Sequence, residues 1–192
     1  IEFFSLTRPL PGHPWEKATG DAPTVRAWGQ RDYGNRVGIF RIMDVLTKHG
    51  IRATATVNSD ICDHHPQIIE DAVKLGWEFM GHNKTNSARL TGMTLDEERE
   101  VIKSSLARLA QATGRKPAGW LGSGLAETWN TLDILAAEGC SYVSDWVNDD
   151  QPYLMDTKPA RLVYLPYSYE INDSPQLYYR DRSAEEFESM IK

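Results

Sequence analysis

The sequence is poor in cysteine and has no long apolar run. Its two cysteines, Cys62 and Cys140, lie far apart among 192 residues. That spacing does not favour a disulfide framework, so we interpret both as packing residues in a reducing compartment. No stretch of about 18 apolar residues is present, so no membrane span is predicted. A basic stretch followed by an apolar one is also missing at the N-terminus, so no export signal is predicted and we expect a cytoplasmic protein.

The sequence also has fewer basic residues than acidic ones. The 27 acidic residues outnumber the 21 lysines and arginines, which leaves a formal net charge of -6 at neutral pH. This balance repels nucleic acid and anionic membranes, so neither is expected as a partner. A small-molecule substrate that is neutral or weakly polar fits better. With 41% hydrophobic residues, the chain can bury the core of one domain.

Glycine-rich phosphate loops are missing as well. Neither a dinucleotide-binding fingerprint nor a P-loop occurs in the sequence. Nicotinamide and nucleotide chemistry are therefore not expected, and we predict no cofactor.

Strand-like and helix-like segments alternate along the chain. Apolar and β-branched runs predict strands at residues 52–57, 77–80, 119–122, 142–147 and 162–167. Helical periodicity predicts helices at residues 35–48, 66–76, 94–114 and 127–138. This succession predicts parallel strands joined by right-handed crossovers, in an α/β barrel or an open doubly wound sheet.

The two ends of the chain differ from this pattern. Residues 1–4 are strand-like, and a capping box from Ser183 to Glu186 opens a helix that stops at Lys192. We therefore expect that the chain is incomplete at both ends. Residues 4–31 are rich in proline, glycine and charge and show no regular periodicity. We interpret this segment as a lid or an interface arm.

Each predicted strand runs into a polar loop, and such loops gather at one end of a parallel sheet. The most informative loop delivers His82, and Asn86 follows four residues later. Two imidazoles at that spacing could bind a divalent cation, but one imidazole and one neutral amide supply too little ligand strength. The sequence therefore predicts a hydrolytic site that is built on a metal-site plan with the metal removed.

The order of these segments resembles the polysaccharide deacetylase superfamily, and most of all its metal-independent branch of cofactor-free allantoinases and cyclic imide hydrolases. The residues that carry the resemblance are 33–38, 81–82, 119–122, 127–133, 145–153 and 166–173. It implies an α/β fold, a distorted (β/α) barrel of the polysaccharide deacetylase type that is incomplete at the chain ends. Residues 1–192 would then be a single catalytic domain. Because arms such as residues 4–31 often cross a neighbouring subunit in this family, the resemblance also implies a homo-oligomer.

The resemblance also implies catalytic residues. In metal-dependent members of the family, two adjacent aspartates supply a general base and a metal ligand, and two histidines complete the metal site. The matching positions hold Glu2, Phe3, His82 and Asn86. Two of the three metal ligands are therefore replaced, whereas the base and one histidine remain. This pattern implies that Glu2 is the general base, that His82 donates a hydrogen bond or a proton, and that no metal takes part.

Aromatic and polar residues complete the predicted site. Trp28, Tyr33 and Arg36 could stack on a planar ring and hydrogen-bond its carbonyls. Alternatively, Trp28 packs over the barrel mouth and Arg36 pairs with an acidic neighbour. The other predicted substrate-binding residues are Asn86, Trp120, Glu127 and Asp149. For two of them a plainer role stays open, because Trp120 is also a core candidate and Asp149 also fits a solvated or capped turn.

These residues predict a metal-independent hydrolase that opens a cyclic amide or imide ring, such as a hydantoin, an imide or an allantoin-like ring. Flanking nitrogen or a second carbonyl activates such a ring carbonyl, so a carboxylate base and neutral hydrogen-bond donors suffice for the addition of water. Two alternatives remain. One is a metal-dependent carbohydrate N-deacetylase that uses unexpected ligands, and the other is a non-catalytic barrel scaffold.

Overall fold

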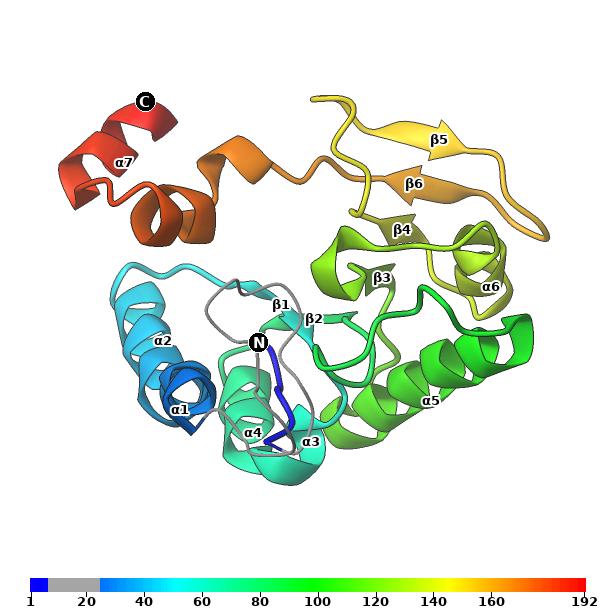
Figure 1. The fold of residues 1–192 in the computed structure, drawn as a ribbon, viewed down its shortest axis with the longest axis horizontal. Coiled ribbons are helices and arrows are strands. Elements are labelled where there is room, and N and C mark those ends of the chain that lie inside the picture. Colours follow the sequence, from blue (N-terminus) through cyan, green and yellow to red (C-terminus); the bar gives the residue numbers. More distant parts are fainter. Residues whose placement is uncertain (7–24) are drawn as a thin grey trace.

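The computed structural model describes residues 1–6 and 25–192 (Figure 1). In this part of the chain, six strands form one sheet in the order β1-β2-β3-β4-β6-β5. The strands are β1 (Thr54–Val57), β2 (Glu78–Gly81), β3 (Gly119–Trp120), β4 (Tyr142–Val143), β5 (Tyr153–Met155) and β6 (Leu162–Tyr164). All neighbouring pairs are parallel except β5 with β6, which is antiparallel. The predicted α/β class with a mainly parallel sheet is confirmed.

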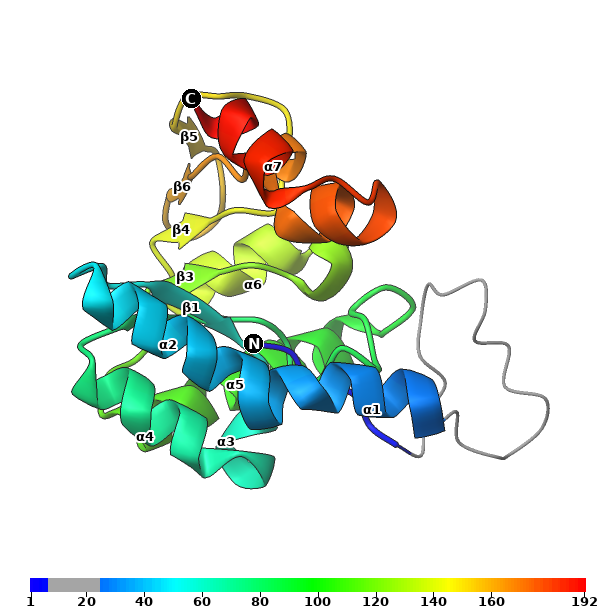
Figure 2. The ribbon, with the colours of Figure 1, turned by 90° about the vertical axis from the view of Figure 1, so that its left-hand side faces the viewer.

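Helices connect most of the strands. The α-helices are α1 (Val25–Tyr33), α2 (Ile39–Lys48), α3 (Ile61–His64), α4 (Pro66–Lys74), α5 (Leu95–Thr113), α6 (Thr131–Ala137) and α7 (Ala184–Ile191). Four shorter helical segments are the π-helices η1 (Gly34–Gly38) and η4 (Ser174–Tyr179) and the 3-10 turns η2 (Ser123–Leu125) and η3 (Tyr169–Ile171). In Figures 1 and 2, α7 stands apart from α2, α4 and α5. None of the described helices is long and apolar enough to cross a membrane.

Local sequence explains where the helices begin and end. Pro66 starts α4, where its missing N–H costs least. At the start of α5, the Thr94 hydroxyl accepts from the backbone of Glu97, and the Glu97 carboxylate accepts from the backbone of Thr94. Gly114 ends this helix in the left-handed conformation, with a φ of 75°. The same capping box recurs in α7, between Ser183 and Glu186.

Two clusters of buried side chains form the core. One lies between α5, α6 and strands β3, β4 and β6, and the other lies between α2, α3, α4, α5 and strands β1 and β2. The first includes Leu90, Ile102, Leu106, Trp120, Leu135, Cys140, Val143 and Tyr164. The second includes Met43, Val57, Ile61, Cys62, Ile68, Phe79 and Leu109. Helix α5 therefore joins the two halves of the sheet.

The two cysteines are packing residues, as predicted. Cys62 and Cys140 are both buried and unpaired. Burial raises the pKa of each thiol to about 11, so both stay protonated at neutral pH.

The structure corrects several predicted boundaries. Residues 25–31 were predicted as part of an irregular segment, but they lie in α1, where only Ala27 is buried and no apolar stripe marks the helix. Residues 7–24, the rest of the predicted lid or arm, lie outside the described residues. Helix α6 begins at Thr131 instead of residue 127. Strand β5 and the short helix α3 were not predicted. Residues 1–4 do not form a strand. They lie beside the end of β1, where Asn58 N donates a hydrogen bond to Ile1 O.

Gly81 is needed for close packing at the end of β2. A Cβ at this position would lie 2.5 Å from the ring of the fully buried Trp120. We expect Gly81→Ala to lower the free energy of unfolding by about 1–3 kcal/mol, because the indole must move within a packed core. Urea denaturation measures this change.

Gly29→Ala in α1 is the matched control. A Cβ there meets no atom within 4 Å, so we expect no loss and a gain of up to about 1 kcal/mol from helix propensity. Equal effects of the two substitutions would contradict the packing argument.

Candidate active site

One buried amide connects the segments that carry the predicted catalytic residues. Asn58 follows β1 and is fully buried. Its Oδ1 accepts a hydrogen bond from Phe3 N at 2.7 Å. Its Nδ2 donates to the carbonyl oxygen of His82, to Asn86 Oδ1 at 3.1 Å and to Ser123 Oγ at 3.4 Å. Asn58 therefore holds residues 1–3 and the loops after β2 and β3 together. The sequence marked it only as part of a polar loop.

Asn86, which the sequence predicted to contact substrate, is one of the residues that hydrogen-bond to Asn58. It is buried, and its Oδ1 accepts from Asn58 Nδ2 and, at 2.5 Å, from Ser123 Oγ. Both lone pairs of that oxygen are therefore engaged. Asn86 acts mainly within the network and offers no free oxygen to a bound group.

His82 leaves the end of β2 and is 4% exposed. Its Nδ1 lies 2.5 Å from the carbonyl oxygen of Leu121. Because a carbonyl oxygen only accepts, Nδ1 carries a proton, and Nε2 is the ring nitrogen that is left to face Glu2. Nε2 lies 3.4 Å from Glu2 Oε1. The structure thus brings the two predicted catalytic residues together, and we call them the Glu2–His82 dyad.

The charge state of Glu2 follows from its surroundings. Partial removal of water opposes ionisation of the carboxyl group, although the side chain is 48% exposed. The hydrogen bond and the charge of His82 outweigh this effect, so the pKa of Glu2 lies below its ordinary 4.5. The carboxylate is ionised at neutral pH and lies opposite Nε2. A proton on Nε2 then completes an ion pair that holds one proton acceptor and one proton donor side by side.

The dyad opens into a cavity of about 870 Å³, which we call the dyad cavity. Leu121, Gly122 and Gly124 lie on one wall, and residues of the loop after β6 lie on another. The polar and charged side chains that line it, besides the dyad, include Arg31, Arg89, Tyr167, Tyr169, Asn172 and Asp173. The volume lies within the range of about 300–1,000 Å³ that is usual for small-molecule sites.

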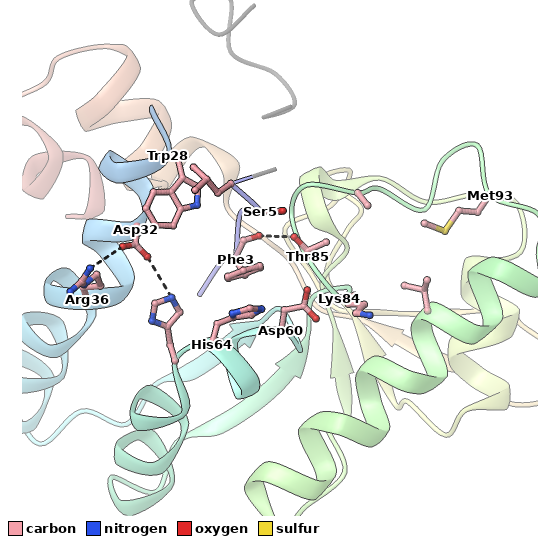
Figure 3. A pocket seen from close by; sticks show the side chains of 14 residues that line it. Phe3, Ser5, Trp28, Asp32, Arg36, Asp60, His64, Lys84, Thr85 and Met93 are labelled. Atoms are coloured by element: carbon pink, nitrogen blue, oxygen red, sulfur yellow. Dashed lines mark hydrogen bonds and ion pairs between the residues drawn. The ribbon is translucent and has the colours of Figure 1, made fainter. Parts of the chain in front are cut away.

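A second cavity, of about 1020 Å³, lies on the other side of Phe3 (Figure 3). Side chains alternate along an extended segment, so Glu2 lines the dyad cavity and Phe3 lines the second one. The Phe3 ring stacks on His64 with 4.3 Å between ring centroids. Asp32 points toward Arg36, at 3.8 Å, and toward His65, at 3.5 Å.

Three of the predicted substrate-binding residues lie away from the dyad cavity. Trp28 and Arg36 line the second cavity, and Tyr33 lines neither. The Trp28 indole donates to Phe4 O at 2.8 Å, and Arg36 pairs with Asp32. The structure therefore does not bring these three side chains into the dyad cavity, and the contact of Arg36 with Asp32 matches the alternative interpretation of Arg36. Helix α1, which the sequence did not reveal, sets their positions.

Three further predictions need correction. Trp120 is fully buried in the core and lines neither cavity, so its plainer interpretation holds. Asp149 is exposed and its Oδ1 accepts from Gln151 N at 3.0 Å, as in a capped turn. Glu127 does not line the dyad cavity, and its Oε2 accepts from Trp146 Nε1 at 3.0 Å.

Glu127 instead belongs to a buried acid pair behind the cavity wall. Its partner Asp145 is 7% exposed and accepts from Gly122 N at 2.6 Å. The two remaining oxygens, Asp145 Oδ2 and Glu127 Oε1, are buried without a donor among the described residues. Burial raises the pKa of both carboxyl groups, and the charge of Glu127 raises that of Asp145 further. We therefore infer that the two carboxyl groups hold one proton between them. The bond from Gly122 N to Asp145 fixes the backbone next to Leu121, whose carbonyl oxygen lies against His82 Nδ1.

The donor set does not fit a divalent cation. Phe3 stands where the resemblance places a carboxylate, and the Asn86 oxygen is already engaged. Glu2 and His82 remain, whereas catalytic zinc sites use about three protein ligands. Within residues 1–6 and 25–192, no group of three or more histidine, cysteine, aspartate or glutamate side chains is arranged to hold a metal.

The parallel sheet and the acid-base pair at the carboxyl ends of its strands define an α/β protein with a candidate hydrolytic site. Residues 20–143 match the family model of the polysaccharide deacetylases, so the chain belongs to this family. This match identifies the family as a whole and does not distinguish its metal-independent branch.

Individual relatives agree with the family. A Schizosaccharomyces pombe protein described as a polysaccharide deacetylase is 24% identical over 157 residues, which are 74% of this chain and 49% of that protein. A crystal structure from Mycobacterium smegmatis, also described as a polysaccharide deacetylase, has a TM-score of 0.72 and 27% identity over 78% of this chain and 52% of its own. The PuuE allantoinase structure has a TM-score of 0.74 and 25% identity, over 90% and 56%. The chain thus spans about half the length of the curated relative.

Asn58→Asp tests the network. The substitution keeps the acceptor for Phe3 N but replaces the donor with an oxygen that faces the carbonyl of His82 and Asn86 Oδ1. We expect the free energy of unfolding to fall by about 2 kcal/mol or more, because a buried group loses its hydrogen bonds and gains charge. Chemical denaturation measures the loss. Asn130→Asp at the exposed start of α6 is the control and is expected to change stability by less than about 0.5 kcal/mol.

Asp145→Asn tests the shared proton. The raised pKa means that the folded state holds a proton that the unfolded state has lost, so wild-type stability falls as the pH rises from about 4 to the folded pKa of the pair. Asparagine still accepts from Gly122 N and supplies a permanent donor toward Glu127. We expect the variant to be more stable than wild type at pH 8, by on the order of 1 kcal/mol, and to show a flatter pH dependence.

Urea denaturation at pH 5 and pH 8 measures this difference. The exposed Asp149→Asn is the control, since its amide can still accept from Gln151 N. Parallel pH profiles of Asp145→Asn and wild type would contradict a shared proton.

Proposed function

We propose that this chain carries a metal-independent hydrolase site that opens a cyclic amide or imide by acid-base addition of water. The main support is the Glu2–His82 dyad, in which a carboxylate and an imidazole lie 3.4 Å apart at a cavity of substrate size. A donor set too small for a cation favours the same reaction. Similarity to an allantoinase adds support for ring-amide hydrolysis.

Glu2 is the general base in this proposal. Its lowered pKa keeps the carboxylate ionised, so it can accept a proton from a water molecule at neutral pH. The water oxygen then forms a bond to the ring carbonyl carbon. Such proton transfer contributes about 10²–10⁴-fold to a rate.

His82 is the general acid. Its Nε2–H donates a proton to the ring nitrogen as the carbon–nitrogen bond breaks, while Nδ1–H stays bound to Leu121 O and holds the ring orientation. The proton that Glu2 gained can then pass to Nε2 and restore the dyad. The balance is one water added and one ring opened to a carboxylic acid, with the ring nitrogen retaining the donated proton.

Tyr167 is suited to stabilise the charge that develops on the carbonyl oxygen. Asn172 Nδ2 donates to Tyr167 Oη, which leaves the phenol proton free to point into the dyad cavity. Burial, together with the charges of Asp173 and Glu2, raises the pKa of Tyr167, so it remains a neutral donor. A donor of this kind strengthens its hydrogen bond as the oxyanion forms.

Ring opening of hydantoin, succinimide and allantoin tests the proposal. We expect turnover by protein from which a strong chelator has removed metals, and we expect Glu2→Gln to reduce kcat/KM by about 100-fold or more because the amide cannot accept the proton. Absorbance of the ring or chromatography of the product measures the rate. The acid limb of the wild-type pH profile is expected below pH 4.5, in line with the pKa of Glu2.

Glu100→Gln on the exposed face of α5 is the matched control and is expected to keep wild-type activity. Activity that disappears with chelation and returns with zinc would contradict the proposal. Release of acetate from chito-oligosaccharides under the same conditions would instead favour the carbohydrate N-deacetylase. A folded protein without turnover on either substrate class would favour a binding scaffold.

A further inference from the structure

Arg89 is a charged residue of the dyad cavity that the mechanism does not use. It lies in the loop between β2 and α5, is exposed and lines the same cavity as Glu2 and His82. A Cβ built on Gly124 would lie 3.1 Å from Cζ, Nε and Nη2 of Arg89. Because all three guanidinium atoms are equally near, the plane of the group lies against the backbone of Gly124. A glycine is needed there both for this contact and for its φ of +69°.

This contact leaves the edge of the guanidinium available. Arg89 makes no ion pair or hydrogen bond with any other described residue. Two carboxylates line the same cavity, but each is already held. Glu2 faces His82, and Asp173 Oδ1 accepts from Ser174 N at 2.8 Å. Within residues 1–6 and 25–192, the N–H groups along the outer edge of Arg89 therefore have no acceptor.

Local charge thus differs from the charge of the whole chain. The net charge of -6 favours neutral substrates, yet one wall of the dyad cavity presents a cation. A second guanidinium, that of Arg31, lines the cavity as well and stacks over the Phe4 ring at 4.6 Å from its centroid. Both groups offset the carboxylates of Glu2 and Asp173 in the same lining, so the cavity does not share the negative balance of the whole chain.

We propose that Arg89 binds a carboxylate carried by the ring substrate, so that the preferred substrate is an anionic cyclic amide. The guanidinium fork matches a carboxylate in a two-point hydrogen bond, which a neutral ring cannot offer. Packing on Gly124 holds the group in place, so little conformational entropy is lost on binding. This assignment rests on the proposed function, because it names the substrate class of the same site.

Binding of two matched probes tests the proposal without turnover. Hydantoin and hydantoin-5-acetate share the ring and differ by one carboxylate arm. Calorimetric titration is done in the Glu2→Gln background, which blocks hydrolysis. We expect at least about tenfold tighter binding of hydantoin-5-acetate, since a hydrogen bond to a charged group contributes that much. In the added Arg89→Gln variant, this preference is expected to disappear, whereas Arg89→Lys keeps only part of it.

The control is Arg99→Gln on α5, where the arginine pairs with Asp96 at 3.1 Å and does not line the dyad cavity. It is expected to keep the preference. An equal preference in the Arg89→Gln variant, or none in the parent, would overturn the assignment of Arg89. Circular dichroism of each variant establishes that it is folded.

Turnover of the same two compounds by the otherwise wild-type protein separates the two proposals. Hydrolysis of both rings at equal kcat/KM, with no effect of Arg89→Gln on their ratio, would overturn Arg89 recognition and leave ring hydrolysis intact. Selective binding that depends on Arg89, without hydrolysis of either ring, would support Arg89 and contradict the proposed function.

Discussion

The side-chain amide of Asn58 is the interaction on which the candidate site depends. Its oxygen and nitrogen bind the backbone of residue 3, the carbonyl of His82 and the side chains of two loops. Three segments that are distant in sequence therefore meet at the carboxyl end of the parallel strands. A buried amide in this position must satisfy each of its hydrogen bonds, so the loops have little freedom to move apart. This constraint sets the relative positions of Glu2 and His82.

Further hydrogen bonds fix the ring of His82 and the backbone next to it. Leu121 O fixes the ring orientation of His82, and the acid pair of Asp145 and Glu127 fixes the backbone beside Leu121. Meanwhile Phe3, at the position of an expected metal ligand, stacks on His64 and turns away from the dyad cavity. Together these contacts hold a carboxylate and an imidazole side by side, and within residues 1–6 and 25–192 too few ligands surround them for a cation.

The sequence predicted the alternation of strands and helices because apolar periodicity is a local signal. It also placed His82 correctly at the end of a strand. Glu2 was named through family resemblance, since nothing local marks it. Helix α1 was not predicted because it buries almost no apolar side chain. The positions of Trp28 and Arg36 at the second cavity were not predicted for the same reason.

The roles of Asn58 and of the Asp145–Glu127 pair depend on contacts between distant segments, which no local pattern encodes. We infer that His82 keeps a proton on Nδ1, bound to Leu121 O, and turns Nε2 toward Glu2. Nitrogen-15 NMR of the His82 ring across pH tests it most directly, with the signals assigned by a His82→Gln variant. We expect the Nδ1 signal of a protonated nitrogen, because Nδ1 lies against the carbonyl oxygen of Leu121. A neutral ring with its proton on Nε2 would contradict it.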